Sequence, residues 1–289
     1  MQISVEKQAV IDQILALLIP IRGVQAVVLG GSHARGAAHA GSDLDIGIYY
    51  SENDPFAIED IRAAAVALSG DPAQQVTGFY GWGAWVNGGG WIHTPVCKVD
   101  FLYRSLEHVQ RAIRAAEQGH TEHDFDQQPA YGFYSVIYLA ETRICHCLYD
   151  PCGHIVRLKA QVETYPAALK QKTVASTLWM AEFSLMHADG YAAAGDVYAT
   201  VGALTRIASF MTQALFALNE TYFMSDKAAV SDMVAFRLIP PDYRARLANL
   251  LGQAGHTTVE LHSSVEGLRG LWSDVVALTG GSYQPAFRV

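Results

Sequence analysis

The stretch GGSHARGAAHAGSDLDI, residues 30–46, decides the fold. It follows the short apolar run Gln25–Leu29, which predicts a β-strand ending at Gly30 and Gly31. Glycines have no β-carbon, so backbone N–H groups at such a turn can approach a phosphate closely. Ser32 adds a hydroxyl at the start of a predicted short helix, whose N-terminus attracts anions. The pattern therefore predicts a phosphate-binding turn.

Acidic residues follow this turn. Asp43 and Asp45 are separated by one residue at the start of a predicted second strand, so their side chains emerge on the same face, roughly 6–7 Å apart at Cα. Asp100 lies between the apolar residues Val99 and Phe101 on another predicted strand, which can bring its carboxylate to the same place. Mg²⁺ prefers a few carboxylates together with phosphate oxygens. Three such acids and a phosphate cradle suffice for two-metal phosphoryl-type transfer.

This pattern, Gly-Ser-x₁₀-Asp-x-Asp with apolar flanks and a later third acid, resembles the nucleotidyltransferase superfamily that includes DNA polymerase beta. The ten residues between Ser32 and Asp43 are the count seen in minimal and antibiotic-modifying nucleotidyltransferases. The motifs cover about residues 20–105. The remainder is similar to the helical half of bacterial nucleotidyltransferase-like proteins. The resemblance implies a mixed-sheet α/β nucleotidyltransferase fold followed by an all-α helical bundle.

The resemblance also implies a metal-dependent chemistry. Asp43 and Asp45 would bind two Mg²⁺ or Mn²⁺ ions. Asp100 would bind the metal on the acceptor side, where it is also a candidate general base. The reaction implied is attack of an acceptor hydroxyl on the α-phosphorus of a nucleoside triphosphate, with pyrophosphate as the leaving group. Read alone, Asp43 is explained as a turn cap, whereas Asp45 between Leu44 and Ile46 needs a partner.

The nucleotide-binding residues implied by the resemblance are those of the turn. The backbone of Gly30 and Gly31 and the hydroxyl of Ser32 would hold the triphosphate, with Arg35 near the phosphates. Each has a structural alternative: two glycines after a strand form a tight turn, and serine is a good helix N-cap. Arg35 has an ion pair with Asp43 as its alternative role. The combination, rather than any one residue, favours the functional interpretation.

Several residues outside the motif are weaker candidates for the acceptor side. Glu182 is a candidate base on a predicted helix, with a water-facing boundary glutamate as the simpler interpretation. Asp196 is either a helix N-cap or a contact for a cationic substrate group, and Lys227 is either a phosphate contact or a solvated lysine. Trp82 and Trp91 are expected in core or lid packing, with stacking on a base or sugar as the alternative.

The catalytic domain is expected to span residues 1–152, with helix and strand alternating. Helices are predicted over Val5–Leu18 and Pro55–Leu68. A hairpin is predicted within Val76–Ile92, turning at Asn87-Gly88-Gly89-Gly90. A late strand over Ile144–Tyr149, with buried cysteines, is expected to return to the sheet. Zinc binding by its cysteines is the alternative, but the spacing of Cys145 and Cys147 departs from that of the usual ligand pair.

The helical acceptor-binding domain is expected to span residues 153–289. Apolar positions in Ala168–His187 recur with helical spacing, and Ala199–Leu218 is apolar nearly all round, which predicts a buried central helix. Pro240-Pro241 is expected to open another helix, and Thr257 with Glu260 forms the pattern of a capping box.

The composition of the chain limits the classes of partner that we expect. The formal net charge is −8, and the sequence contains no Lys/Arg run, so we do not expect nucleic acid as a partner. A small or cationic acceptor suits an acidic protein better, which favours a small-molecule acceptor. We see no secretory signal or membrane span, which favours a cytoplasmic protein. A protein or RNA acceptor, a non-catalytic nucleotide-binding module, and a homodimeric assembly stay open as alternatives.

Overall fold

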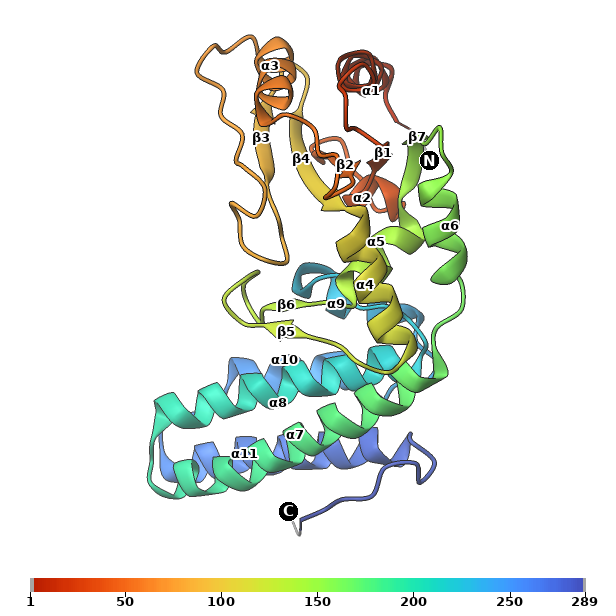
Figure 1. Ribbon diagram of the computed structural model, residues 1–289. Helices are drawn as coiled ribbons and strands as arrows, with labels where there is room; N and C mark the ends of the chain where they lie inside the picture. Colours follow the sequence, from red (N-terminus) through yellow and green to blue (C-terminus); the bar gives the residue numbers. More distant parts are fainter. Residues whose placement is uncertain (1–2, 288–289) are drawn as a thin grey trace. The chain divides into compact units, whose positions relative to one another are not determined.

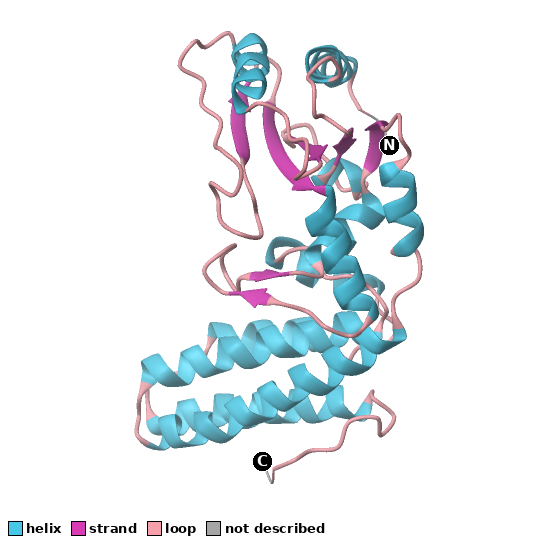
Figure 2. Cartoon of the chain, in the orientation of Figure 1, coloured by secondary structure: helices cyan, strands magenta, loops and turns pink. Residues whose placement is uncertain are grey.

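The computed structural model describes residues 3–287, and of Ala228 the backbone only. The chain forms two compact units. One comprises residues 1–114, 123–127 and 135–164, and the other comprises residues 115–122, 128–134 and 165–289. The first unit contains a five-stranded sheet, and the second is built from long helices (Figures 1 and 2). The α/β fold with a helical C-terminal region is thus confirmed.

The five strands of the sheet lie in the order β3-β4-β2-β1-β7. β2 and β4 pair in parallel, while the other neighbours pair antiparallel, so the sheet is mixed. β7 pairs with β1, as predicted for the late strand. The strands are β1 Ala26–Leu29, β2 Leu44–Tyr50, β3 Gly89–His93, β4 Lys98–Ser105 and β7 His146–Tyr149.

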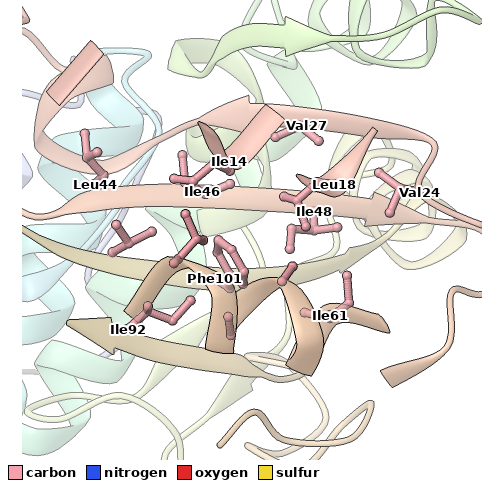
Figure 3. Packing of buried hydrophobic residues seen from close by; sticks show 14 of the residues in the cluster. Ile14, Leu18, Val24, Val27, Leu44, Ile46, Ile48, Ile61, Ile92 and Phe101 are labelled. Atoms are coloured by element: carbon pink, nitrogen blue, oxygen red, sulfur yellow. The ribbon is translucent and has the colours of Figure 1, made fainter. Parts of the chain in front are cut away.

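The hydrophobic core of the first unit lies on one face of this sheet. Ile14 and Leu18 of α1 (Val5–Leu18) and Ile61 of α3 (Ile58–Ser69) pack there against alternate strand residues such as Ile46 and Phe101 (Figure 3). Ser4 is the N-cap of α1, and its hydroxyl accepts from the N–H of Lys7. Because side chains alternate along a strand, the residues between the core positions emerge on the opposite face.

The predicted turn at Asn87–Gly90 is wrong. The hairpin between β3 and β4 turns at residues 94–97, where Thr94 Oγ1 accepts from the N–H of Cys97 and donates to its carbonyl. Gly89 and Gly90 lie inside β3 instead. A β-carbon on Gly89 would lie 1.8 Å from the carbonyl oxygen of Phe101, and one on Gly90 would lie 2.8 Å from Val76. These glycines therefore permit close approach of neighbouring segments.

The first unit contains further elements outside the sheet. Arg104 and Glu141 form a two-pronged ion pair with distances of 2.9 Å, and Arg104 is almost fully buried. Of the two cysteines in the predicted strand, Cys145 is buried as expected, whereas Cys147 is exposed, so its predicted burial is wrong. The elements are α2 Gly31–Ala34, α4 Leu106–Glu117, β5 His123–Asp124, α5 Ile137–Ile144 and α6 His154–Gln161; α4 ends in the second unit.

The second unit is helical, as predicted. Asp196 caps α8 by accepting from the N–H of Ala199 at 3.0 Å, and Thr257 and Glu260 form the expected capping box of α11. Its elements are β6 Phe133–Tyr134, α7 Ala167–Ala193, α8 Val197–Leu218, α9 Asp226–Asp232, the 3₁₀ turn Met233–Ala235, α10 Tyr243–Gly252 and α11 Thr258–Ala277.

α8 is the described helix that is long and apolar enough to cross a membrane by length and composition alone. However, 61% of its most apolar window is buried against the rest of the protein. Leu204, Ile207 and Met211 are fully buried, which is the packing expected of a central bundle helix.

Candidate functional site

The face of the sheet opposite the core carries a row of acidic residues. Asp45 on β2 and Asp100 on β4 are register partners in the parallel pairing of these strands. Their apolar neighbours in sequence, Leu44, Ile46 and Phe101 among them, are fully buried in the core. Because directly opposed residues on adjacent strands project from the same face, the two carboxylates emerge together, about 5 Å apart at the backbone. The sequence-predicted pairing of these two acids is therefore present.

Asp43 joins this pair through a lysine. It precedes β2 by one residue, and Lys98 is the first residue of β4. The ammonium of Lys98 lies 3.3 Å from Oδ2 of Asp43 and 2.9 Å from Oδ1 of Asp100. The two carboxylates thus share one cationic group. Sequence reasoning missed Lys98, although a lysine two residues before Asp100 on the same strand must share its face.

The electrostatics around Asp45 favour a cation. Burial raises the pKa of Asp45 to about 6, and the neighbouring charges of Asp100, Glu141 and Asp43 act in the same direction. Lys98 opposes them only in part. The pKa of Lys98 is itself raised: burial lowers it, but hydrogen bonding and charge from Asp100 and then Asp43 outweigh that effect. Negative charge is therefore in surplus at this place.

The glycine turn packs directly against Asp45. The N–H of Gly30 donates to the carbonyl of Asp45 at 2.8 Å, so this N–H is already engaged. Gly31 has φ +55°, and a β-carbon there would lie 1.7 Å from Oδ2 of Asp45. Ser32 and Arg35, both half-buried, occupy the first turn and the C-cap of α2. The turn and the acids thus form one continuous surface on adjacent strands β1 and β2.

A buried lysine holds the loop between the turn and Asp43. Lys7 of α1 is only 6% exposed, and its ammonium donates to the carbonyls of Ala40 at 3.0 Å and Ser42 at 2.7 Å. The hydroxyl of Ser42 in turn accepts from the N–H of His39 at 2.9 Å. Lys7 was not predicted as a site residue. Its position three residues before the buried Val10 was the available signal, since it places a charge on the apolar face of α1.

An aromatic pair flanks the acids on the side away from the glycine turn. Trp91 on β3 is the register partner of Asp100 and is 59% exposed. Trp82 stacks on it with ring centroids 5.1 Å apart and an interplanar angle of 20°. A β-carbon on Gly89 would lie 3.0 Å from Trp82, so Trp82 covers that position of β3. Trp91 is therefore an exposed indole beside the acids, held by a second indole.

The three candidates in the second unit have different environments. Glu182 on α7 is fully buried, so the water-facing interpretation of it is wrong. Its carboxylate accepts from the hydroxyl of Tyr283 and from the N–H groups of Ala286 and Phe287. Asp196 serves as the N-cap of α8, and Lys227 is an exposed residue of α9. A direct role of these residues toward an acceptor stays a prediction.

The acid row fits a divalent cation by its chemistry. Three carboxylates share a neighbourhood with surplus negative charge, and an ammonium already lies against two of them. As placed, however, no three or more His, Cys, Asp or Glu side chains among residues 3–287 are gathered to hold a metal ion. Instead, the ammonium of Lys98 lies between Asp43 and Asp100. Without a cation between them, these carboxylates would repel each other.

Comparison with known proteins gives a family match for part of the chain. Residues 11–81 match the nucleotidyltransferase domain family, a range that includes the glycine turn, Asp43 and Asp45 but not Asp100. No curated protein matches the chain. A solved structure of a nucleotidyltransferase-like protein from Exiguobacterium sibiricum 255-15 has 9% identity and a TM-score of 0.46, covering 96% of this chain and 75% of that one. That likeness is too distant to carry structural detail to this chain.

Proposed function

Residues 11–81 place the chain in the nucleotidyltransferase superfamily, and from this premise we propose that it transfers a nucleoside monophosphate from a nucleoside triphosphate to a hydroxyl of a small-molecule acceptor. The observation that carries the proposal is the register pairing of Asp45 with Asp100 beside the Gly30-Gly31 turn. It sets these two carboxylates next to the turn that the sequence pattern assigns to phosphate, and Lys98 links Asp43 to Asp100. Pyrophosphate is the second product.

The acids are the proposed catalytic residues. Asp43, Asp45 and Asp100 hold Mg²⁺ or Mn²⁺, which when bound neutralises the charge that develops on the phosphate oxygens. Asp100 also accepts the proton of the acceptor hydroxyl. The oxygen of that hydroxyl forms a bond to the α-phosphorus, and the bond from the α-phosphorus to the bridging oxygen of pyrophosphate breaks. The surplus negative charge around Asp45 supports a cation-dependent role for this row.

The turn is the proposed phosphate site. Because the N–H of Gly30 is engaged by Asp45, Gly30 contributes its shape, and the hydrogen bonds to phosphate come from Gly31 and the residues after it. Ser32 supplies a hydroxyl, and Arg35, at the end of the same short helix, supplies positive charge. Lys7 keeps the following loop in place through the carbonyls of Ala40 and Ser42.

The acceptor side is proposed at the opposite edge of the acids. The sheet order β3-β4-β2-β1 sets Trp91 and the glycine turn on opposite sides of Asp45 and Asp100. An exposed indole there offers a stacking surface to a ring of the acceptor. The net charge of −8 favours a cationic acceptor, and residues 153–289 with Asp196 and Lys227 remain the proposed acceptor-binding domain.

A transfer assay tests this function. The protein is incubated with Mg²⁺, each α-labelled nucleoside triphosphate in turn, and a panel of hydroxyl-bearing metabolites and antibiotics, together with RNA and protein arms. We expect pyrophosphate release and label on one small molecule, with neither in the Asp45→Asn variant. Label on RNA or on protein alone would overturn the small-molecule acceptor. Nucleotide binding without any transfer across the panel and both arms would count against catalysis.

A further inference from the structure

Lys98 occupies a place where cation binding is expected. Its ammonium lies 3.3 Å from Asp43 and 2.9 Å from Asp100. Both contacts involve carboxylate oxygens, the ligand type that Mg²⁺ prefers at about 2.0–2.1 Å. A divalent ion bound by these same oxygens would lie within a few ångströms of the ammonium, and the two cations would repel. One of them must leave.

From this geometry we propose that Lys98 is a displaceable internal counter-cation. It pairs with Asp43 and Asp100 in the metal-free protein, offsets part of their negative charge, and releases both carboxylates when a divalent metal binds. The proposal rests on the proposed function only in taking the acids as metal ligands. Lys98 therefore sets how much metal is needed to load the site, because every binding event must first break its two ion pairs.

The side chain of Lys98 is suited to leave. It is 32% exposed, so its flexible stem reaches water without crossing the core. Arg104 on the same strand shows the opposite arrangement: its side chain is 5% exposed, and its guanidinium holds Glu141 through two hydrogen bonds. One strand thus carries a fixed structural ion pair and a loosely held one. Only the loosely held pair involves the acids of the site.

Metal binding to matched lysine variants tests the proposal. Lys98→Met removes the charge and keeps the length of the side chain. Lys170→Met is the control, because Lys170 is 35% exposed and pairs with Glu220 at 2.8 Å in the second unit. Mn²⁺ binding is followed by electron paramagnetic resonance without nucleotide. We expect the Kd for Mn²⁺ to fall about tenfold in Lys98→Met and to stay unchanged in Lys170→Met.

Thermal unfolding gives a second readout. Lys98→Met leaves Asp43, Asp45 and Asp100 without their internal cation, so the metal-free melting temperature should fall and Mn²⁺ should restore it. Equal or weaker Mn²⁺ binding by a folded Lys98→Met variant would overturn the proposal. If the wild type binds no more Mn²⁺ than Asp45→Asn, the acids do not hold metal, and the proposed function fails as well.

A measurement on the wild-type protein covers the case in which Lys98→Met does not fold. Acetylation of Lys98 by acetic anhydride, normalised to that of Lys170, is followed by mass spectrometry with and without saturating Mg²⁺. Release of the ammonium from the carboxylates should increase the labelling of Lys98 several-fold. Unchanged or reduced labelling, at a Mg²⁺ concentration that displaces bound Mn²⁺, would show that Lys98 stays in place and would refute the proposal.

Discussion

Gly31 and Asp45 lie so close together that a β-carbon on Gly31 would be 1.7 Å from Oδ2 of Asp45. The carboxylate fills the space that any other residue would need at the turn. The N–H of Gly30 and the carbonyl of Asp45 add a hydrogen bond of 2.8 Å at the same junction. The turn therefore fixes the direction of the Asp45 side chain as well as its own shape.

Gly31→Ala should therefore displace the carboxylate. Gly36→Ala is the matched control, because both glycines have positive φ, +55° and +70°, but nothing lies within 4 Å of a β-carbon on Gly36. Both substitutions should lower the free energy of unfolding by about 1–2 kcal/mol, because alanine is disfavoured in the left-handed backbone conformation. Only Gly31→Ala should also lose most Mn²⁺ affinity and at least about 100-fold in transfer rate. Melting temperatures and Mn²⁺ titrations of the two variants make the comparison; equal Mn²⁺ affinities would refute it.

Asp45→Asn should abolish transfer while stabilising the metal-free fold at neutral pH. The pKa of Asp45 is raised to about 6 from 3.8, so between about pH 4 and 6 the native state binds more protons than the unfolded state. The contribution of this carboxyl to the free energy of unfolding thus falls as pH rises through that window, by about 3 kcal/mol at most. We expect the free energy of unfolding of the variant to match that of the wild type below pH 4 and to exceed it at pH 7. Denaturant titration in the presence of a chelator measures both values.

Two outcomes would contradict this account of Asp45. If Asp45→Asn unfolds the protein at pH 7, the carboxylate has a structural partner that outweighs the repulsion from Asp100 and Asp43. If the variant keeps full transfer activity, Asp45 is not a metal ligand. Mg²⁺ should also raise the melting temperature of the wild type and leave that of the variant unchanged, because ligand binding stabilises only the native state that binds it.

The strands that position the acids could be predicted from the sequence. Alternation in Leu44-Asp45-Ile46 and in Val99-Asp100-Phe101 assigns the apolar residues to one face and the acids to the other, and the structure has this arrangement. Local patterns are sufficient here because a strand has a period of two. The capping box at Thr257 was also predictable from a local pattern, because its hydrogen bonds join residues that are three apart in sequence.

Features that depend on distant segments were not predictable in this way. Glycines at 88–90 indicate a turn by local chemistry, but Gly89 lies within β3 because the backbone of Phe101 passes close to it. The strand and helix patterns assign Lys98 and Lys7 to their faces, but the hydrogen bonds from Lys98 to Asp43 and from Lys7 to Ala40 span 55 and 33 residues of sequence, respectively. Glu182 looks like a boundary residue on its helix, and only the return of the C-terminal segment buries it. No local pattern carries that information.

Trp91→Ala should weaken binding of the acceptor more than binding of the nucleoside triphosphate. Loss of a stacking surface costs about 1 kcal/mol, so KM for the acceptor should rise about five- to tenfold while KM for the triphosphate changes less than twofold. Trp91→Phe keeps an aromatic ring and should retain most of the affinity. The kinetics are measured with whichever acceptor the transfer assay identifies. Equal KM changes for both substrates would place Trp91 outside the acceptor side.

Glu182→Gln should destabilise the second unit without acting on the chemistry. The buried carboxylate accepts from the hydroxyl of Tyr283 and from two backbone N–H groups, at Ala286 and Phe287. An amide keeps one acceptor oxygen and turns two donors toward groups that also donate. The free energy of unfolding should fall by about 2–4 kcal/mol, and the C-terminal segment should become sensitive to limited proteolysis.

Tyr283→Phe separates this anchoring role from a catalytic one. It removes the phenol hydroxyl but keeps the two backbone donors to Glu182, so it should cost less, about 1–1.5 kcal/mol. If Glu182 only anchors the C-terminal segment, the folded fraction of each variant should transfer nucleotide at the wild-type rate. A folded Glu182→Gln variant with the pH-rate profile of a missing base, alongside an unaffected Tyr283→Phe, would instead assign proton transfer to Glu182. That result would require the carboxylate to leave Tyr283, Ala286 and Phe287 during turnover, and proteolysis in the presence of substrates would then increase.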